Sequence, residues 1–134
     1  MPDLPLPFLA LMIGGLACAL VAIATVVLRP DGKGNPVLAA ALAAGFSAFT
    51  AITIVTEGVT PVLVNHASNL WGVQVWWDLL FSLTIALFLI APRARAAGMN
   101  ILPWTLFIAA TASIGLLAMC ARLFWLEREA ASKP

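Results

Sequence analysis

Charged residues are scarce in this sequence: they make up 10% of its 134 residues, whereas 63% are hydrophobic. A soluble domain is nearer a quarter charged and half apolar. A water-soluble fold of this length could not hide so much apolar surface, because small domains bury only part of what their chains expose. The formal net charge of +1 provides no basic surface for nucleic acid. We therefore expect the lipid bilayer to be the main partner of the chain.

Residues that bind metals or carry redox chemistry are almost absent. His66 is the one histidine, and the two cysteines, Cys18 and Cys120, lie far apart within apolar runs. A metal site needs more ligands, and no CxxC pair supports dithiol chemistry. No HExxH, phosphate-binding loop or paired-carboxylate signature occurs. We predict no metal, no cofactor and no assignable catalytic residue, and we interpret both cysteines as small buried residues.

Four stretches are long enough to cross a bilayer, which takes about 20 apolar residues. They lie at residues 4–28, 34–56, 71–91 and 96–121, and Asp78 is the one ionisable residue among them. Prolines such as Pro30, Pro36 and Pro92 mark the connections and helix ends. The sequence predicts an all-α fold, a four-transmembrane-helix bundle of two antiparallel hairpins, as one integral membrane domain over residues 1–134. The predicted helices cover residues 6–28, 36–57, 72–91 and 101–125 approximately.

The N-terminal segment has no lysine or arginine before its apolar run, which argues against a cleaved signal peptide. The longer connection, from Glu57 to Leu70, contains the apolar sequence Val62-Leu63-Val64. Because these side chains would be exposed in a free loop, we expect this segment to lie on the membrane surface.

The distribution of cations predicts an orientation. The two short connections hold Arg29, Lys33, Arg93 and Arg95, and the C-terminal segment holds Arg122, Arg128 and Lys133. Cytoplasmic loops are enriched in lysine and arginine. We therefore expect both short connections in the cytoplasm of a bacterium, both termini in the periplasm, and the chain in the inner membrane.

Asp78 is the most informative ionisable residue, because charges within a membrane are costly. Residues 79–91 would make a helix of roughly 20 Å, shorter than a hydrocarbon core of about 30 Å. The helix must therefore start before Asp78, which places the carboxylate within the outer part of the bilayer. Arg122, near the end of the fourth predicted helix, would reach the same depth. Because Cβ bonds tilt toward a helix N-terminus, the two side chains would lean toward each other, so we predict an Asp78–Arg122 ion pair; otherwise both face the headgroups.

Two further ionisable residues are predicted on the same outer side. Glu57 ends the second predicted helix, and His66 lies in the connection that follows. With Asp78 and Arg122 they are candidates for a ligand-binding site or a structural ion pair. The alternative interpretation is that helix ends are simply where charges are tolerated.

Short motifs between Gly58 and Glu129 resemble a family of small bacterial inner-membrane proteins with four helices and no assigned function. The matching residues are Asn65 or Asn69, Asp78, the turn Arg95-Ala96-Ala97-Gly98, and the ending Leu126-Glu127-Arg128-Glu129. The chain departs from the family pattern at Ala121-Arg122-Leu123-Phe124, where members carry Pro-Leu-Phe-Leu. The resemblance implies a fold and a compartment, and it implies no activity.

Three functional hypotheses follow. The first is a non-enzymatic accessory or interaction subunit of a larger membrane complex, which predicts a wide apolar face without a cleft. The second is binding or transport of a small apolar or cationic molecule, with Asp78 and Glu57 as polar contacts; transport predicts a homo-oligomer that encloses a path. The third is a membrane enzyme acting on a lipid or isoprenoid through the same carboxylates, which predicts a cleft that opens to lipid at Asp78.

Overall fold

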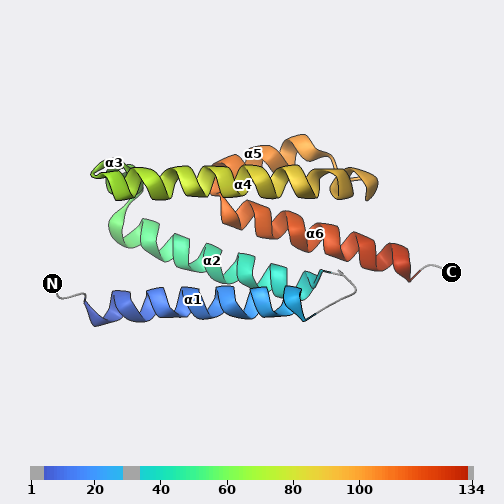
Figure 1. The fold of residues 1–134 in the computed structure, drawn as a ribbon, viewed down its shortest axis with the longest axis horizontal. Coiled ribbons are helices and arrows are strands. Elements are labelled where there is room, and N and C mark those ends of the chain that lie inside the picture. Colours follow the sequence, from blue (N-terminus) through green and yellow to red (C-terminus); the bar gives the residue numbers. More distant parts are fainter. Residues whose placement is uncertain (1–4, 29–33, 133–134) are drawn as a thin grey trace. The chain divides into compact units, whose positions relative to one another are not determined.

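The computed structural model describes residues 5–28 and 34–132. The chain divides into two units, Met1–Gly34 and Asn35–Pro134. The first unit contains α1 (Leu6–Val27), and the second contains five helices in its described part (Figure 1). These are α2 (Pro36–Glu57), α3 (Thr60–Ala67), α4 (Leu70–Ala96), α5 (Ile101–Thr111) and α6 (Ser113–Ala131). No strand occurs in either described range, which confirms the all-α prediction.

Asparagine side chains cap the N-termini of three helices. The amide oxygen of Asn35 accepts hydrogen bonds from two backbone N–H groups of α2, both at 3.1 Å. Asn69 accepts from the first turn of α4 at 2.8 Å, and Asn100 accepts from α5 at 3.2 Å. Asparagine is among the best N-cap residues because its short side chain satisfies N–H groups that have no partner within the helix. These caps fix where the helices of the second unit begin.

Three helices are long and apolar enough to cross a membrane: α1, α2 and α4. Their lengths of 22, 22 and 27 residues correspond to roughly 33–40 Å of helix. The predicted bounds of the second helix, 36–57, are those of α2. The third predicted helix is longer than expected, since α4 continues through Pro92 to Ala96. A proline so near a helix end removes one backbone hydrogen bond and leaves the last turn intact.

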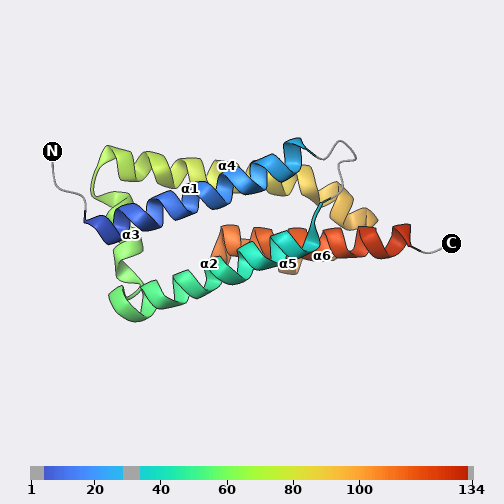
Figure 2. The ribbon, with the colours of Figure 1, turned by 90° about the horizontal axis from the view of Figure 1, so that it is seen from below.

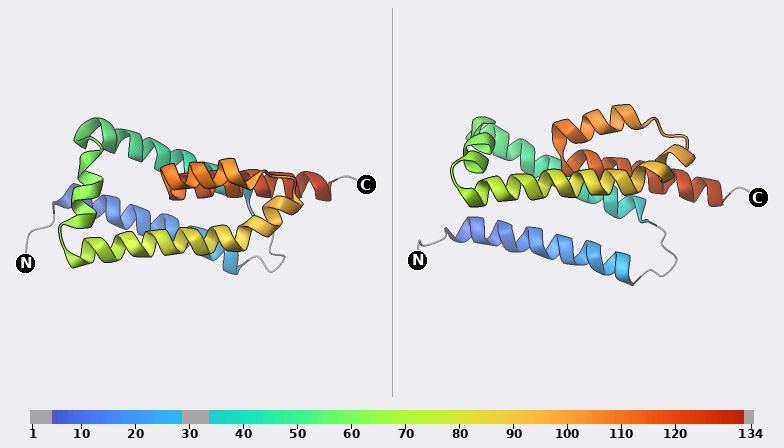
Figure 3. Two further views of the ribbon diagram at one scale, coloured as in Figure 1. Left: turned by 90° about the horizontal axis from the view of Figure 1, so that it is seen from above. Right: turned by 45° about the horizontal axis from the view of Figure 1, so that its top comes forward.

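The prediction of a single continuous fourth helix is wrong. The sequence predicts one helix over residues 101–125, but the structure divides this segment at Ala112, whose φ of 52° ends α5 and begins α6. Figures 1 and 3 show α5 running back beside α4 and α6 then turning again toward the C-terminus. At 11 residues, α5 is roughly 16 Å long, about half a hydrocarbon core. The C-terminal part of the chain is therefore a short helical hairpin.

A glycine permits this hairpin to close. A Cβ built on Gly115 would lie 2.8 Å from the Cα of Ile108 and 2.9 Å from its backbone nitrogen. The backbones of α5 and α6 are therefore in contact, and a larger residue would hold them apart. The tip is also held by the Ala112 N–H, which donates to the Ile108 carbonyl at 2.7 Å.

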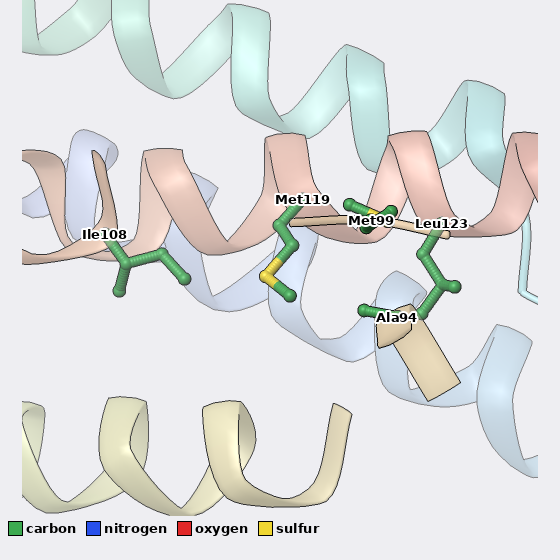
Figure 4. Packing of buried hydrophobic residues seen from close by; sticks show 5 residues of the cluster. All are labelled: Ala94, Met99, Ile108, Met119 and Leu123. Carbon is green, nitrogen blue, oxygen red and sulfur yellow. The ribbon is translucent and has the colours of Figure 1, made fainter. Parts of the chain in front are cut away.

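The core of the second unit lies where the hairpin packs on α2 and α4. Its buried side chains come from the end of α4, the following turn, α5 and α6: Ala94, Met99, Ile108, Met119 and Leu123 (Figure 4). The buried residues of α2, namely Pro36, Ala39 and Ala43, are all in its first half. Helix α2 lies antiparallel beside α6 (Figure 2). Because lipid provides no hydrophobic driving force between helices, small residues such as Ala39 and Ala43 favour packing by letting the backbones approach closely.

The connection between α2 and α4 is ordered as a helix. It forms α3, which packs on the first turns of α4. Gly72 makes this contact possible, because a Cβ there would collide with the Asn65 carbonyl oxygen and approach the His66 backbone. The expectation that this segment lies on a membrane surface stays a prediction.

Candidate functional site

The short hairpin leaves a cleft in the second unit. The buried residues of α2 are confined to its first half, and the second half of this helix faces the middle of α4 across the cleft. The cleft has a volume of about 640 Å³. It is lined by α2 (Phe46, Thr50, Ile54), α3 (Val62), α4 (Trp76, Leu79, Leu80, Leu83, Thr84, Leu87) and the hairpin (Thr105, Ile108, Ala109, Ala110, Thr111, Ala112, Ile114). Its lining residues place it between α2 and α4, with Val62 of α3 and the residues around Ala112 also bordering it.

The chemistry of the cleft is apolar. Among the described residues that line it, none has an ionisable side chain. Three of its threonine hydroxyls donate to carbonyls one turn earlier in their own helices: Thr84 to Leu80 at 2.8 Å, Thr105 at 3.0 Å and Thr111 at 2.7 Å. A hydroxyl bonded in this way has already donated its one proton. The cleft can therefore hold a hydrocarbon group, and its described lining offers no acidic or basic side chain.

The structure does not bring the predicted site residues together. Glu57 is exposed at the end of α2, and Asp78 is exposed on α4. Arg122 is exposed on α6. His66 on α3 is half-buried, and its ring contacts Trp76 edge-on with the ring centroids 5.2 Å apart. His66 is thus the one of the four that touches a residue of the cleft.

The predicted Asp78–Arg122 pair does not form in the described part of the chain, and the break at Ala112 explains why. Within the described ranges, the single ion pair joins Arg93 to Glu127. That pair sets the end of α4 level with the end of α6, which runs in the same direction as α4 (Figure 1). Arg122 is five residues before Glu127, and Asp78 is fifteen before Arg93. At about 1.5 Å per residue, the two side chains are separated by roughly 15 Å along the helices.

The Arg93–Glu127 pair is a contact between distant segments that the sequence did not reveal. Its geometry is bidentate: Arg93 Nε donates to Oε1 at 3.0 Å and Nη2 donates to Oε2 at 2.8 Å. The guanidinium also lies 5.8 Å from the centre of the Phe124 ring, within the range of cation–π attraction. Both side chains are partly exposed, at 48% and 34%, so the pair fixes the position of α6 more than it contributes energy.

The described residues form no metal site. Over residues 5–28 and 34–132, no group of three or more histidine, cysteine or acidic side chains is close enough to hold an ion. Cys18 is exposed on α1 and Cys120 is half-buried on α6, and both are free thiols. The exposure of Cys18 differs from the buried position expected for it.

Comparisons with protein-family models, with curated proteins and with solved structures found no match. The resemblance to a family of small four-helix inner-membrane proteins therefore stays a prediction.

Proposed function

We propose that α1, α2 and α4 cross a bacterial cytoplasmic membrane and that α5–α6 is a re-entrant hairpin, which enters and leaves through the same face. The support is the apolar length of the three helices and the shortness of α5. Irregular backbone such as that at Ala112 is tolerated at membrane depth when protein surrounds it. Here the tip is half-buried at Ala112 and borders the cleft between α2 and α4.

The hairpin changes the predicted orientation of the C-terminus. The start of α2 and the ends of α4 and α6 lie at the same end of the second unit (Figures 1 and 3). In the sequence, six of the seven lysines and arginines occur near these three points, namely Arg29, Lys33, Arg93, Arg95, Arg128 and Lys133. The seventh, Arg122, lies nine residues before the end of α6, at the midpoint of the helix. With four crossings, four basic residues would lie on one side of the membrane and three on the other. With a re-entrant hairpin, all seven would lie on the same side. The positive-inside rule places this end in the cytoplasm, with the C-terminus inside and the N-terminus in the periplasm.

Cysteine labelling tests this orientation. We expect Ser132→Cys, in a chain carrying Cys18→Ala and Cys120→Ala, to be protected from an impermeant thiol reagent in intact cells and labelled after permeabilisation. A cysteine at Val59, between α2 and α3, should show the opposite pattern. Labelling of Ser132→Cys from outside would restore four crossings and overturn the re-entrant hairpin.

We further propose that the chain binds a single hydrocarbon chain, from a membrane lipid or an isoprenoid, in the cleft. One observation carries this function: about 640 Å³ of apolar space lies among the helices proposed to cross the membrane, with α3 at one end. A cleft of this size is within the range of small-molecule sites. Asp78, through which the enzyme hypothesis would act, does not line this cleft and borders a separate shallow hollow on α4.

Photolabelling tests the binding. A phospholipid carrying a diazirine at mid-chain, in vesicles with the purified chain, should label cleft residues on α2 and α4. Ala109→Trp, on the cleft side of α5, should remove most of this labelling. Leu106→Trp is a matched control, because Leu106 is 63% exposed on the same helix and does not line the cleft. Equal labelling of both variants would refute the proposal, as would a cross-link showing that α1 fills the cleft.

A second candidate function is the accessory subunit of a larger membrane complex. The observation that favours it is the position of Asp78, on the side of α4 that faces away from the cleft.

A further inference from the structure

An intramembrane carboxylate lies on a face of α4 that the rest of the second unit leaves uncovered. Successive residues of a helix are about 100° apart. Trp76 and Leu80 line the cleft, and Asp78, two residues from each, is therefore about 200° around the helix from both. Asp78 is exposed, and within the described residues it forms no ion pair and no side-chain hydrogen bond.

The depth of Asp78 follows from the crossing proposed for α4, on which this inference rests. Arg93, paired with Glu127, marks the cytoplasmic end of the helix. Asp78 is fifteen residues earlier, or roughly 22 Å along the axis. In a hydrocarbon core of about 30 Å, this places the carboxylate roughly 8 Å inside the outer boundary. Charged groups at such depth are rare, and they normally pair with one another or face a polar interior.

Asp78 borders a shallow, aromatic-lined hollow on the surface of α4. This hollow of about 330 Å³ is lined by residues of α4 alone: Trp71, Gln74, Val75, Trp77, Asp78 and Phe81. The three aromatic side chains are 75%, 58% and 59% exposed, and the rings of Trp77 and Phe81 are packed edge-on at 5.8 Å. Tryptophan is among the residues enriched in binding hot spots, and two tryptophans, Trp71 and Trp77, border this hollow. The hollow is on the opposite side of α4 from the cleft, and the two share no lining residue.

Within residues 5–28 and 34–132, no lysine or arginine side chain pairs with this carboxylate. Helix α1 contains no ionisable residue, so it could cover the hollow without pairing Asp78. The basic residues described in the second unit, Arg93, Arg95, Arg122 and Arg128, lie toward the opposite end of α4 and α6 from Asp78. A second copy would bring another carboxylate to the same depth. Charge complementarity therefore favours a different protein.

We propose that the α4 face centred on Asp78 binds a transmembrane helix of a partner membrane protein, and that this helix carries a lysine or arginine in the outer leaflet. The basic side chain lies in the hollow beside Asp78. Gln74, one turn earlier on the same side, supplies a second hydrogen-bonding group. The partner thereby provides the charge that makes Asp78 tolerable in the bilayer.

Designed helices in vesicles test this docking. The probes are two synthetic leucine–alanine transmembrane peptides, one with a single lysine at the depth of Asp78 and one with leucine there. Energy transfer is measured from each peptide to the full chain, labelled at a C-terminal fluorescent protein. Interhelical polar contacts in membranes change association by about threefold to thirtyfold. We expect the lysine peptide to bind wild type more tightly than the leucine peptide by such a factor.

Substitutions at Asp78 test whether the carboxylate is responsible for the preference for the lysine peptide. Asp78→Asn should abolish the preference for lysine, whereas Ile85→Asn, two turns further along the same face, should retain it. Asp78→Lys should bind a glutamate peptide in place of the lysine peptide, which a fold defect could not produce. Equal binding of both peptides to wild type would overturn the proposal. Self-association of the chain that depends on Asp78 would overturn it in favour of a second copy. Labelling of Ser132→Cys from outside would contradict the proposed topology, and with it the depth of Asp78. If Ser132→Cys is protected but the lysine peptide binds no better than the leucine peptide, only the proposed docking is contradicted.

Discussion

Replacing Gly115 by alanine should open the α5–α6 hairpin. The added Cβ would lie 2.8 Å from the Ile108 Cα, 2.9 Å from its nitrogen and 2.8 Å from the Thr111 hydroxyl oxygen. Two of these three atoms are backbone and cannot rotate away, so α6 must move from α5. Overpacking of this kind costs about 1–3 kcal/mol.

The higher helix propensity of alanine partly offsets this loss of stability. Alanine is favoured over glycine by about 1 kcal/mol in a helix interior, and by less at the third residue of α6, where Gly115 lies. Gly45→Ala, in the middle of α2, is the matched control because nothing lies within 4 Å of the Cβ that alanine would add there. We expect Gly45→Ala to be neutral or stabilising, and Gly115→Ala to be less stable than that control by about 1–3 kcal/mol.

Unfolding in detergent micelles, followed by circular dichroism during titration with a denaturing detergent, measures both variants. If Gly115→Ala is as stable as Gly45→Ala, then the helices are not in backbone contact at this residue. The hairpin would then be held by side chains alone.

Three other predictions concern the contacts that shape the second unit. A double-mutant cycle of Arg93→Gln and Glu127→Gln should give a coupling of up to about 1 kcal/mol that falls with added salt, because the pair is partly exposed; a salt-independent coupling would contradict this. Ala112→Gly should stabilise the chain by about 1 kcal/mol in the same detergent titration, since it relieves the positive φ of a non-glycine residue, and a loss of stability would show that Ala112 is unstrained. Gly72→Ala should separate α3 from α4, because the new Cβ meets the Asn65 carbonyl oxygen; hydrogen exchange should then rise in α3 and stay unchanged in α2.

Strong local signals made part of the fold predictable. Helix α2 begins at Asn35-Pro36 and ends one residue before Gly58, whose φ is 81°, so both of its bounds follow from ordinary capping rules. The polar connections likewise located the ends of α1. These features depend on neighbouring residues, which is why the sequence was sufficient for them.

The hairpin had no such signal. The residues around Ala112 include no proline or glycine before Gly115, and alanine is the best helix former, so hydropathy alone describes residues 96–121 as one crossing. The break depends on the contact of Gly115 with Ile108, a tertiary event. The cleft and the Arg93–Glu127 pair both follow from the break. Sequence reasoning therefore paired Asp78 with Arg122, as a straight helix would require.

The hairpin also has a consequence for how the chain is made. A fourth crossing would oblige the synthesis machinery to export a tail that carries Glu127, Arg128 and Glu129. A segment that dips into the membrane and returns requires no export, because its charged end stays on the side where the ribosome released it. The hairpin can instead insert late, after α2 and α4 have provided the surface that Met119 and Leu123 cover. In the proposed topology, this hairpin would enter the membrane from the cytoplasmic side after the α2 and α4 crossings are in place.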